Sequence, residues 1–343
     1  MGGKQSFPIV ELPHNRVVAI TGANTGLGYE AAKWVAMMGA TVIMACRSKE
    51  RAEKAMQKIQ DEFQVEKAKG TPAICKLEKL SMEFMELDLG SFKSVRSFIK
   101  AYKSSGRKLH VLVCNAGVAL VPFTKTEDGY EVMFQVNYLS HFIMIAHLLP
   151  IMRQSGEDCR IVLVSSDAHR VCNFDLNTMN YSGDPEKFGR LDYYGRSKLY
   201  QIMQMHSMHR RLKGSNVSVN SLHPGFVATE IGRSVQDFRL MKAFGSVTRV
   251  FGLIKTPIDG ALPIINAMVN PDLKGVGGVY FKSLEGGYST AEASDKGDDI
   301  KLKTSARIRH LIKHVLNGSG ATEREGHGPG RPASSNFDFK YVS

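Results

Sequence analysis

The sequence predicts a doubly wound, mostly parallel α/β sheet flanked by helices on both faces. Short apolar runs alternate with amphipathic stretches of helical spacing along most of the 343 residues, and several runs end in glycine or a polar turn. Runs that are apolar throughout are typical of parallel strands covered on both faces. A chain of this length, 43% hydrophobic, can bury a full core.

Six apolar runs are the expected strands. They are residues 16–22 (RVVAITG), 40–47 (ATVIMACR), 82–89 (MEFMELDL), 110–117 (HVLVCNAG), 160–166 (RIVLVSS) and 216–222 (NVSVNSL). Helices are expected between them, the first two over 29–39 and 49–63, because apolar residues recur there at helical spacing. The lysine-rich stretch 65–81 is expected to be a solvated surface insertion.

The net charge of +12 raises the question of a nucleic-acid partner. The basic residues are spread over amphipathic stretches and form no arm with interleaved stacking aromatics. We therefore expect no nucleic-acid partner. An anionic cofactor or an anionic membrane surface accounts for the charge equally well.

Targeting and metal-binding signals are weak. No apolar run reaches the roughly 18 residues that a membrane span needs, and the N-terminus lacks the layout of a secretory signal. The five cysteines are scattered and lack metal-ligand spacing, so we expect no metal site and a reducing, cytoplasmic location.

A glycine-rich bend follows the first expected strand and precedes the first helix. Gly22 permits the tight turn, Gly26 lets the backbone approach a pyrophosphate, and Gly28 allows the helix to pack closely on the strand. The amides of Asn24, Thr25 and Leu27 lie in the same stretch, where a helix N-terminus attracts phosphate. We expect a dinucleotide here.

The end of the second strand indicates which dinucleotide is preferred. NAD sites place a carboxylate there for the ribose 2′-hydroxyl, whereas this chain has Arg47. A planar guanidinium suits a 2′-phosphate. We therefore expect NADP(H) rather than NAD(H), although Arg47 could instead lie at a solvated strand end with no ligand.

Residues 192–200, DYYGRSKLY, contain the candidate acid/base. Tyr194 and Lys198 are four residues apart and therefore share one face of a helix, whereas Tyr193 and Tyr200 do not share it. A phenol has a pKa near 10, and the ammonium of Lys198 together with an oxidised nicotinamide ring would lower it. Such a spacing also arises by chance, so its meaning depends on the surrounding residues.

Several motifs together resemble the short-chain dehydrogenase/reductase family. They are, in order, Thr21-Gly22-x3-Gly26-x-Gly28, Asn115-Ala116-Gly117, Asn137, Ser166, Tyr194-x3-Lys198 and Pro224-Gly225. The chain is most similar to the branch that contains retinol dehydrogenases and WW-domain oxidoreductases, over roughly 16–281. No WW domain is expected, because the only tryptophan lies in the first helix.

The resemblance implies a Rossmann fold and assigns catalytic roles. Lys198 would hold the nicotinamide ribose, and Ser166 would hydrogen-bond the substrate oxygen; Ser165 is the alternative serine. Asn137 would position a water that relays protons to Lys198. Complete catalytic residues argue against a regulatory protein that binds cofactor with little turnover.

The resemblance also implies the remaining cofactor contacts. Two groups would line the adenine and ribose side, and a third group would hold the nicotinamide carboxamide. Asp88 and Leu89 form the first group, and Asn115, Ala116 and Gly117 form the second. Val227 and Thr229 form the group at the carboxamide.

The implied reaction is hydride transfer between nicotinamide and a carbonyl carbon while Tyr194 exchanges a proton with the oxygen. Because cells keep NADP largely reduced, we expect reduction of a hydrophobic, retinal-like or other lipid aldehyde or ketone. A steroid substrate is the alternative. Residues 230–256 mix apolar and basic residues and would cover this substrate. Related enzymes commonly form homo-oligomers, but no residue here decides that.

The two ends of the chain are expected to lie outside one oxidoreductase domain of residues 15–316. The leader, 1–14, begins MGGKQS, which fits N-myristoylation at Gly2. One acyl chain anchors weakly, so peripheral membrane association would also need the basic charge. A short disordered leader explains the same residues. The tail, 317–343, is rich in glycine, serine and proline and is expected to be disordered.

Overall fold

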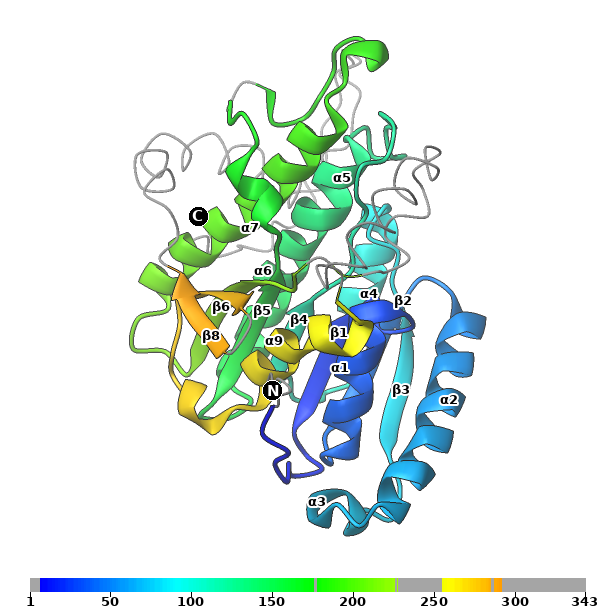
Figure 1. Ribbon diagram of the computed structural model, residues 1–343. Coiled ribbons are helices and arrows are strands. Elements are labelled where there is room, and N and C mark those ends of the chain that lie inside the picture. The colour runs from blue at the N-terminus through cyan, green and yellow to red at the C-terminus, as the bar shows by residue number, and fades with distance from the viewer. Residues whose placement is uncertain (1–6, 176–177, 226, 228–254, 285–286, 292–343) are drawn as a thin grey trace, which may run out of the picture. The chain divides into compact units, whose positions relative to one another are not determined.

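The computed structural model describes residues 7–175, 178–225, 227, 255–284 and 287–291. The chain divides into two units, 1–293 and 294–343, and every described residue belongs to the first unit. That unit is built on an eight-stranded sheet of order β3-β2-β1-β4-β5-β6-β7-β8 (Figure 1). The pairs from β3 through β7 are parallel, and β8 pairs antiparallel with β7.

The first six strands are the six apolar runs of the sequence, so the predicted doubly wound α/β fold is confirmed. All eight strands are β1 (Val17–Thr21), β2 (Thr41–Cys46), β3 (Ser81–Glu86), β4 (Val111–Cys114), β5 (Cys159–Val164), β6 (Val217–His223), β7 (Tyr280–Leu284) and β8 (Gly287–Ala291). Every residue of β1, β4, β5 and β6 is buried, as strands covered on both faces require.

Helices cover both faces of this sheet. On one face α1 contacts α2 and α9, and on the other α4 contacts α6 and α5 contacts α7 (Figure 1). Their bounds are α1 (Gly26–Met37), α2 (Lys49–Ala68), α3 (Pro72–Cys75), α4 (Phe92–Ser104), α5 (Val132–Phe134), α6 (Ser140–Arg153), α7 (Arg190–Arg211) and α9 (Pro257–Val269). Three 3-10 turns are η2 (Asp167–Arg170), η4 (Pro185–Lys187) and η6 (Pro271–Leu273).

Helices α5 and α6 form one continuous segment, because the π-helical turn η1 (Gln135–Leu139) joins them. Together they span Val132–Arg153, 22 residues that are long and apolar enough to cross a membrane by length and composition. This segment was not expected from the sequence, because polar residues interrupt its apolar run. Because 83% of the apolar window is buried inside the protein, the segment is a core helix.

The predicted surface insertion 65–81 is partly wrong. Helix α2 continues to Ala68, and Ile74 on α3 and Leu77 after it are buried against Met37 and Phe63. Two apolar side chains therefore anchor a segment whose lysines remain outside. The lysine-rich composition hid this anchor.

Residues 7–14, which we expected in a leader, pack on the core. The Phe7 and Trp34 rings meet edge to face at 5.2 Å between centroids, and the Leu12 amide donates to the Met38 carbonyl at 2.7 Å. Ordered packing thus begins before the predicted domain boundary at residue 15. The boundary predicted at 316 lies outside the described residues.

Candidate active site

The glycine bend between β1 and α1 requires its glycines for steric reasons. Gly22 has φ of 66°, a left-handed conformation that favours glycine. At Gly28 a Cβ atom would lie 2.3 Å from the Gly22 carbonyl oxygen and 2.5 Å from the Asn115 side-chain nitrogen. The bend and the helix are therefore in direct backbone contact, as predicted for a phosphate-binding turn.

The amino end of α1 opens toward the carboxyl ends of the strands. Asn24 and Thr25 lead into the helix, which begins at Gly26, and Thr25 is extended. The side chain of Thr25, the N-cap residue, makes no capping hydrogen bond to this helix. Its first amides are thus placed to bind an anion, because a helix N-terminus carries unpaired N–H groups and a partial positive charge.

The end of β2 carries a cation where a carboxylate would mark an NAD site. Arg47 follows Cys46 directly and is exposed. Ser48 accepts a hydrogen bond from the Arg51 amide and caps α2, so the serine is structural. Arg47 is therefore an exposed cation at this strand end, and the NADP(H) preference predicted from it stays a prediction.

The ends of β3 and β4 hold the other residues predicted on the adenine and ribose side. Asp88 closes its own turn by accepting from the Gly90 amide, and the Leu89 carbonyl accepts from the Ser140 hydroxyl. The Asn115 side chain donates to the Thr21 carbonyl at 2.9 Å. Ala116 and Gly117 follow Asn115, so β4 is tied to the glycine bend by its own motif.

Tyr194 and Ser166 meet in the structure. The two side chains share a hydrogen bond, and Ser166 also accepts from the Ala168 amide at 3.2 Å. Ser165, the alternative serine, is buried and donates to the Lys198 carbonyl at 2.9 Å. Its hydroxyl is therefore committed to the backbone of α7, whereas Ser166 faces Tyr194.

Tyr193 lies in a different environment from its neighbour. Its ring stacks on Phe188 at 4.8 Å, and the Arg196 guanidinium lies 4.5 Å from the ring centroid. Tyr193 therefore packs into an aromatic cluster whose edge Tyr194 also contacts, and in the part of the chain that the structure describes it shares no hydrogen bond with Ser166 or Lys198.

Lys198 is buried in the same pocket as Tyr194. Its Nζ donates to the Val164 carbonyl at 2.9 Å and lies 5.8 Å from the centroid of the Tyr194 ring. Burial lowers the pKa of Lys198 to about 7, against a small opposing effect of Cys114. The Lys198 side chain can thus change between ammonium and neutral amine near neutral pH.

The predicted lowering of the Tyr194 pKa is not what the structure gives without cofactor. Burial raises the pKa of Tyr194, and the hydrogen bond with Ser166 only partly opposes the rise. Desolvation of the phenol is the larger of these two effects. The phenol therefore keeps its proton at neutral pH.

Asn137 joins three parts of the site from within the π-helical turn. Its Oδ1 accepts from the Val118 amide at 2.8 Å, and its Nδ2 donates to the Val118 carbonyl and to Ser197 Oγ, both at 2.9 Å. Its backbone carbonyl accepts from Gln201 at 2.9 Å. These bonds hold the strand extension after β4 against α7. The predicted water relay stays a prediction.

The remaining predicted residues are only partly described. Val227 forms an isolated parallel bridge with Lys255 and lies against Gly260 of α9. Outside the described residues lie Gly2, Thr229, nearly all of 230–256 and the tail 317–343.

A cleft joins the predicted catalytic and cofactor residues. Its lining comes from five elements or their ends: Leu27, Asn115, Gly117, Val118, Val164, Ser165, Tyr194, Lys198 and Pro224. A larger hollow of about 460 Å³ between β3 and α4 contains none of the predicted residues. In the part of the chain that the structure describes, no three metal-ligating side chains cluster.

Val118 and Ser197 were missed by sequence reasoning. Val118 follows the Asn115-Ala116-Gly117 motif and Ser197 precedes Lys198, so their positions were a signal that we did not use.

A nicotinamide dinucleotide fits these residues. Gly28 has no room for a Cβ, α1 follows β1 without a side-chain cap from Thr25, and both Leu27 and Tyr194 line the cleft. The fold and site are those of a dinucleotide-dependent oxidoreductase. The family model described as short chain dehydrogenase matches residues 16–239, so the chain belongs to this family, whose members use a nicotinamide cofactor.

Relatives place it in the predicted branch. The chain is 38% identical to human retinol dehydrogenase 14 over 293 residues, which cover 85% of each protein. It is 35% identical to the zebrafish WW domain-containing oxidoreductase, covering 84% of this chain and 66% of that one. A solved structure of an uncharacterised protein from Mycobacterium paratuberculosis is 25% identical, covers 93% of this chain and has a TM-score of 0.67.

Proposed function

We propose that the protein reduces a hydrophobic, lipid-like aldehyde or ketone with NADPH, using Tyr194 as the proton donor. The observation that carries the proposal is the partly buried Tyr194–Ser166 pair beside the buried Lys198. A nicotinamide bound in the cleft supplies the hydride. The chain's own residues hold the substrate oxygen and manage its proton.

The proton chemistry favours reduction. A tyrosine whose pKa is raised by burial keeps its proton at pH 7 and can give it to a carbonyl oxygen as that oxygen gains charge. Ser166, bonded to Tyr194, is placed to donate a second hydrogen bond to the same oxygen. Lys198, with a pKa of about 7, can return a proton toward Tyr194.

An apolar cluster beside Tyr194 supports a hydrophobic substrate. Val118 and Tyr194 belong both to the cleft and to this cluster, which also contains Val121, Phe123 and Phe188. An alkyl or isoprenoid chain attached to the carbonyl would find apolar contacts there. The similarity to human retinol dehydrogenase 14 agrees with such a substrate.

Replacing Tyr194 tests the mechanism. We expect Tyr194→Phe to lower kcat for carbonyl reduction about 10²–10⁴-fold, while NADPH binding, followed by its fluorescence, is retained. Retinal, steroid ketones and medium-chain aldehydes form the substrate panel. Tyr200→Phe, on the same helix but outside the apolar cluster, is the matched control and should stay within about twofold. Unchanged turnover in Tyr194→Phe would reject Tyr194 as the acid.

Replacing Arg47 tests the cofactor preference. Arg47→Asp should weaken NADPH use and improve NADH use, because a carboxylate repels the 2′-phosphate and accepts from a 2′-hydroxyl. We expect the ratio of kcat/KM for NADPH to that for NADH to fall at least tenfold, about 1.4 kcal/mol. Arg210→Asp, at the exposed far end of α7, makes the same charge change. An equal ratio shift in both variants would remove Arg47 as the discriminator.

A further inference from the structure

His141 is a buried histidine that the mechanism above does not use. It lies in the first turn of α6 and is 1% exposed. Its Nε2 lies 2.9 Å from Thr21 Oγ1, and its Nδ1 lies 3.2 Å from the Asn137 carbonyl oxygen. One imidazole therefore bridges the last residue of β1, where the glycine bend starts, and the π-helical turn.

The hydrogen-bonding partners fix which ring nitrogen carries the hydrogen. Burial lowers the pKa of His141 to about 4, so the ring is neutral at pH 7 and has one N–H. A carbonyl oxygen can only accept, so the hydrogen is on Nδ1 and bonds to Asn137. Nε2 is then an acceptor, and the Thr21 hydroxyl must donate to it.

The orientation of the Thr21 hydroxyl in turn holds the β4 motif. With its hydrogen directed to His141, Thr21 Oγ1 has lone pairs for the amides of Asn115 at 3.0 Å and Ala116 at 2.9 Å. Among the described residues, the other acceptor within reach of that hydroxyl is the Val113 carbonyl at 3.4 Å, a poorer distance. His141 thus completes a chain of bonds from the core helix to two adjacent cofactor loops.

We propose that His141 is a positioning residue for the nicotinamide dinucleotide, acting as the acceptor that orients Thr21 and thereby fixes the glycine bend against Asn115 and Ala116. The inference rests on the proposed NADP(H) site. It predicts that the acceptor at the Nε2 position, rather than the ring itself, governs cofactor affinity.

Two conservative variants separate the bonds of the ring. His141→Gln can place a carbonyl oxygen near the Nε2 position and keep the bond from Thr21, whereas His141→Asn keeps a donor near Nδ1 and loses that bond. We expect the Kd for NADPH, measured by fluorescence titration, to rise about tenfold in His141→Asn and less than twofold in His141→Gln. His147→Asn and His147→Gln, two turns along on α6, are the matched controls and should change less than twofold.

A double-mutant cycle then ties the effect to Thr21. Thr21→Val should itself raise the Kd about tenfold, and adding His141→Asn to it should change the Kd less than twofold further, because the shared bond is already lost. Urea unfolding checks that each variant is folded. If His141→Asn is unfolded, His141→Gln and Thr21→Val decide the test on the same expected values.

Three results would overturn the inference: His141→Asn binding like the wild type, His141→Gln weakening as much as His141→Asn, or full additivity in the cycle. Wild-type protein that binds no NADPH would instead refute the proposed function. The two failures are therefore distinguishable.

Discussion

A buried cation lies at each end of the parallel strands, and the two cations have different partners. We call the end where the strands finish the carboxyl edge and the end where they start the amino edge. At the carboxyl edge Lys198, 4% exposed, donates to a backbone carbonyl, and no ion pair to it occurs among the described residues. At the amino edge Arg160, 3% exposed, makes two bonds to Asp158 at 2.9 and 2.7 Å. Arg160 belongs to strand β5, and Lys198 contacts Val164, the last residue of that strand.

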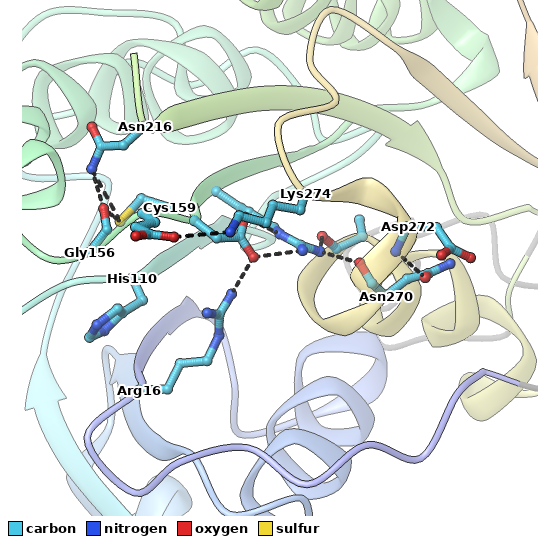
Figure 2. A network of polar contacts seen from close by, with 12 residues as sticks. Arg16, His110, Gly156, Cys159, Asn216, Asn270, Asp272 and Lys274 are labelled. Atoms are coloured by element: carbon cyan, nitrogen blue, oxygen red, sulfur yellow. Dashed lines mark hydrogen bonds and ion pairs between the residues drawn. The ribbon is translucent and has the colours of Figure 1, made fainter. Parts of the chain in front are cut away.

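The amino edge is a closed network (Figure 2). Asp158 also accepts from Arg16 at 3.3 Å, and Arg160 donates to the Asn270 carbonyl at 2.9 Å beyond the end of α9. Burial alone would raise the pKa of Asp158, but Arg160 and Arg16 together hold it below its usual value. The charges are therefore retained and paired with one another, although Arg16 Nε is buried without a hydrogen bond.

The partners of the two buried cations decide whether each can change its protonation state. A buried charge with partners is fixed in its ionised state, whereas a buried lysine without a carboxylate moves its pKa toward neutrality, here to about 7. Only the second kind of group can exchange protons at physiological pH. We infer that the ion pairs at the amino edge stabilise the sheet. We infer that the buried Lys198 at the carboxyl edge lowers stability but allows proton exchange.

The largest expected effect is at the carboxyl edge. Lys198→Met should lower turnover by about a hundredfold or more, because Tyr194 loses its source of protons and the cofactor ribose loses a donor. The measurement is kcat for NADPH-dependent reduction by protein whose folding is verified by circular dichroism. Activity close to wild type would mean that the two edges do not differ in function.

The converse variant at the amino edge should damage stability alone. Asp158→Ala leaves Arg160 and Arg16 without their carboxylate, and breaking a buried pair destabilises by about 3 kcal/mol. Urea denaturation should show this loss, while kcat per folded molecule stays within twofold. Glu157→Ala is the control, since its pair with Lys274 is exposed and contributes less than about 1 kcal/mol. Equal losses in both variants would contradict the network's role.

This comparison was only partly visible in the sequence. The six strands, the glycine bend and the Tyr194–Lys198 face follow from apolar periodicity and residue spacing, which are local. Strands β7 and β8 were not predicted, because both are short and near glycines. The π-helical turn at Asn137 was also missed, since an amide in an apolar helix does not reveal how the backbone is wound.

Long-range contacts and electrostatics account for the rest. Asn137 bonds to Ser197, 60 residues away, and Thr21 to Asn115, 94 residues away, through strand and helix neighbours that no spacing encodes. The lowering of the Tyr194 pKa was predicted with an oxidised nicotinamide beside the phenol and stays a prediction; without cofactor, burial raises that pKa, and residue spacing says nothing of burial. Site membership is therefore easier to predict than the protonation of its members.

The smallest expected effect, and the most specific to the comparison, is the pH dependence of stability. A Lys198 pKa lowered from 10.5 to about 7 means that the charged form destabilises the fold below pH 7, by roughly 5 kcal/mol at 1.36 kcal/mol per pKa unit. Loss of the bond to the Val164 carbonyl offsets about 1–3 kcal/mol of the gain in Lys198→Met. We therefore expect the variant to be about 2 kcal/mol more stable than wild type at pH 6.

The sign follows from proton binding. Between pH 7 and 10.5 the unfolded lysine binds a proton that the folded one does not, so wild-type stability rises with pH through this range and the advantage of Lys198→Met shrinks to zero or below by pH 10. Arg160→Met is the control: its guanidinium does not deprotonate in this range, so its destabilisation should be the same at pH 6 and pH 10. Urea midpoints at both pH values decide the matter, and parallel pH curves for wild type and Lys198→Met would show that Lys198 is not the poised group.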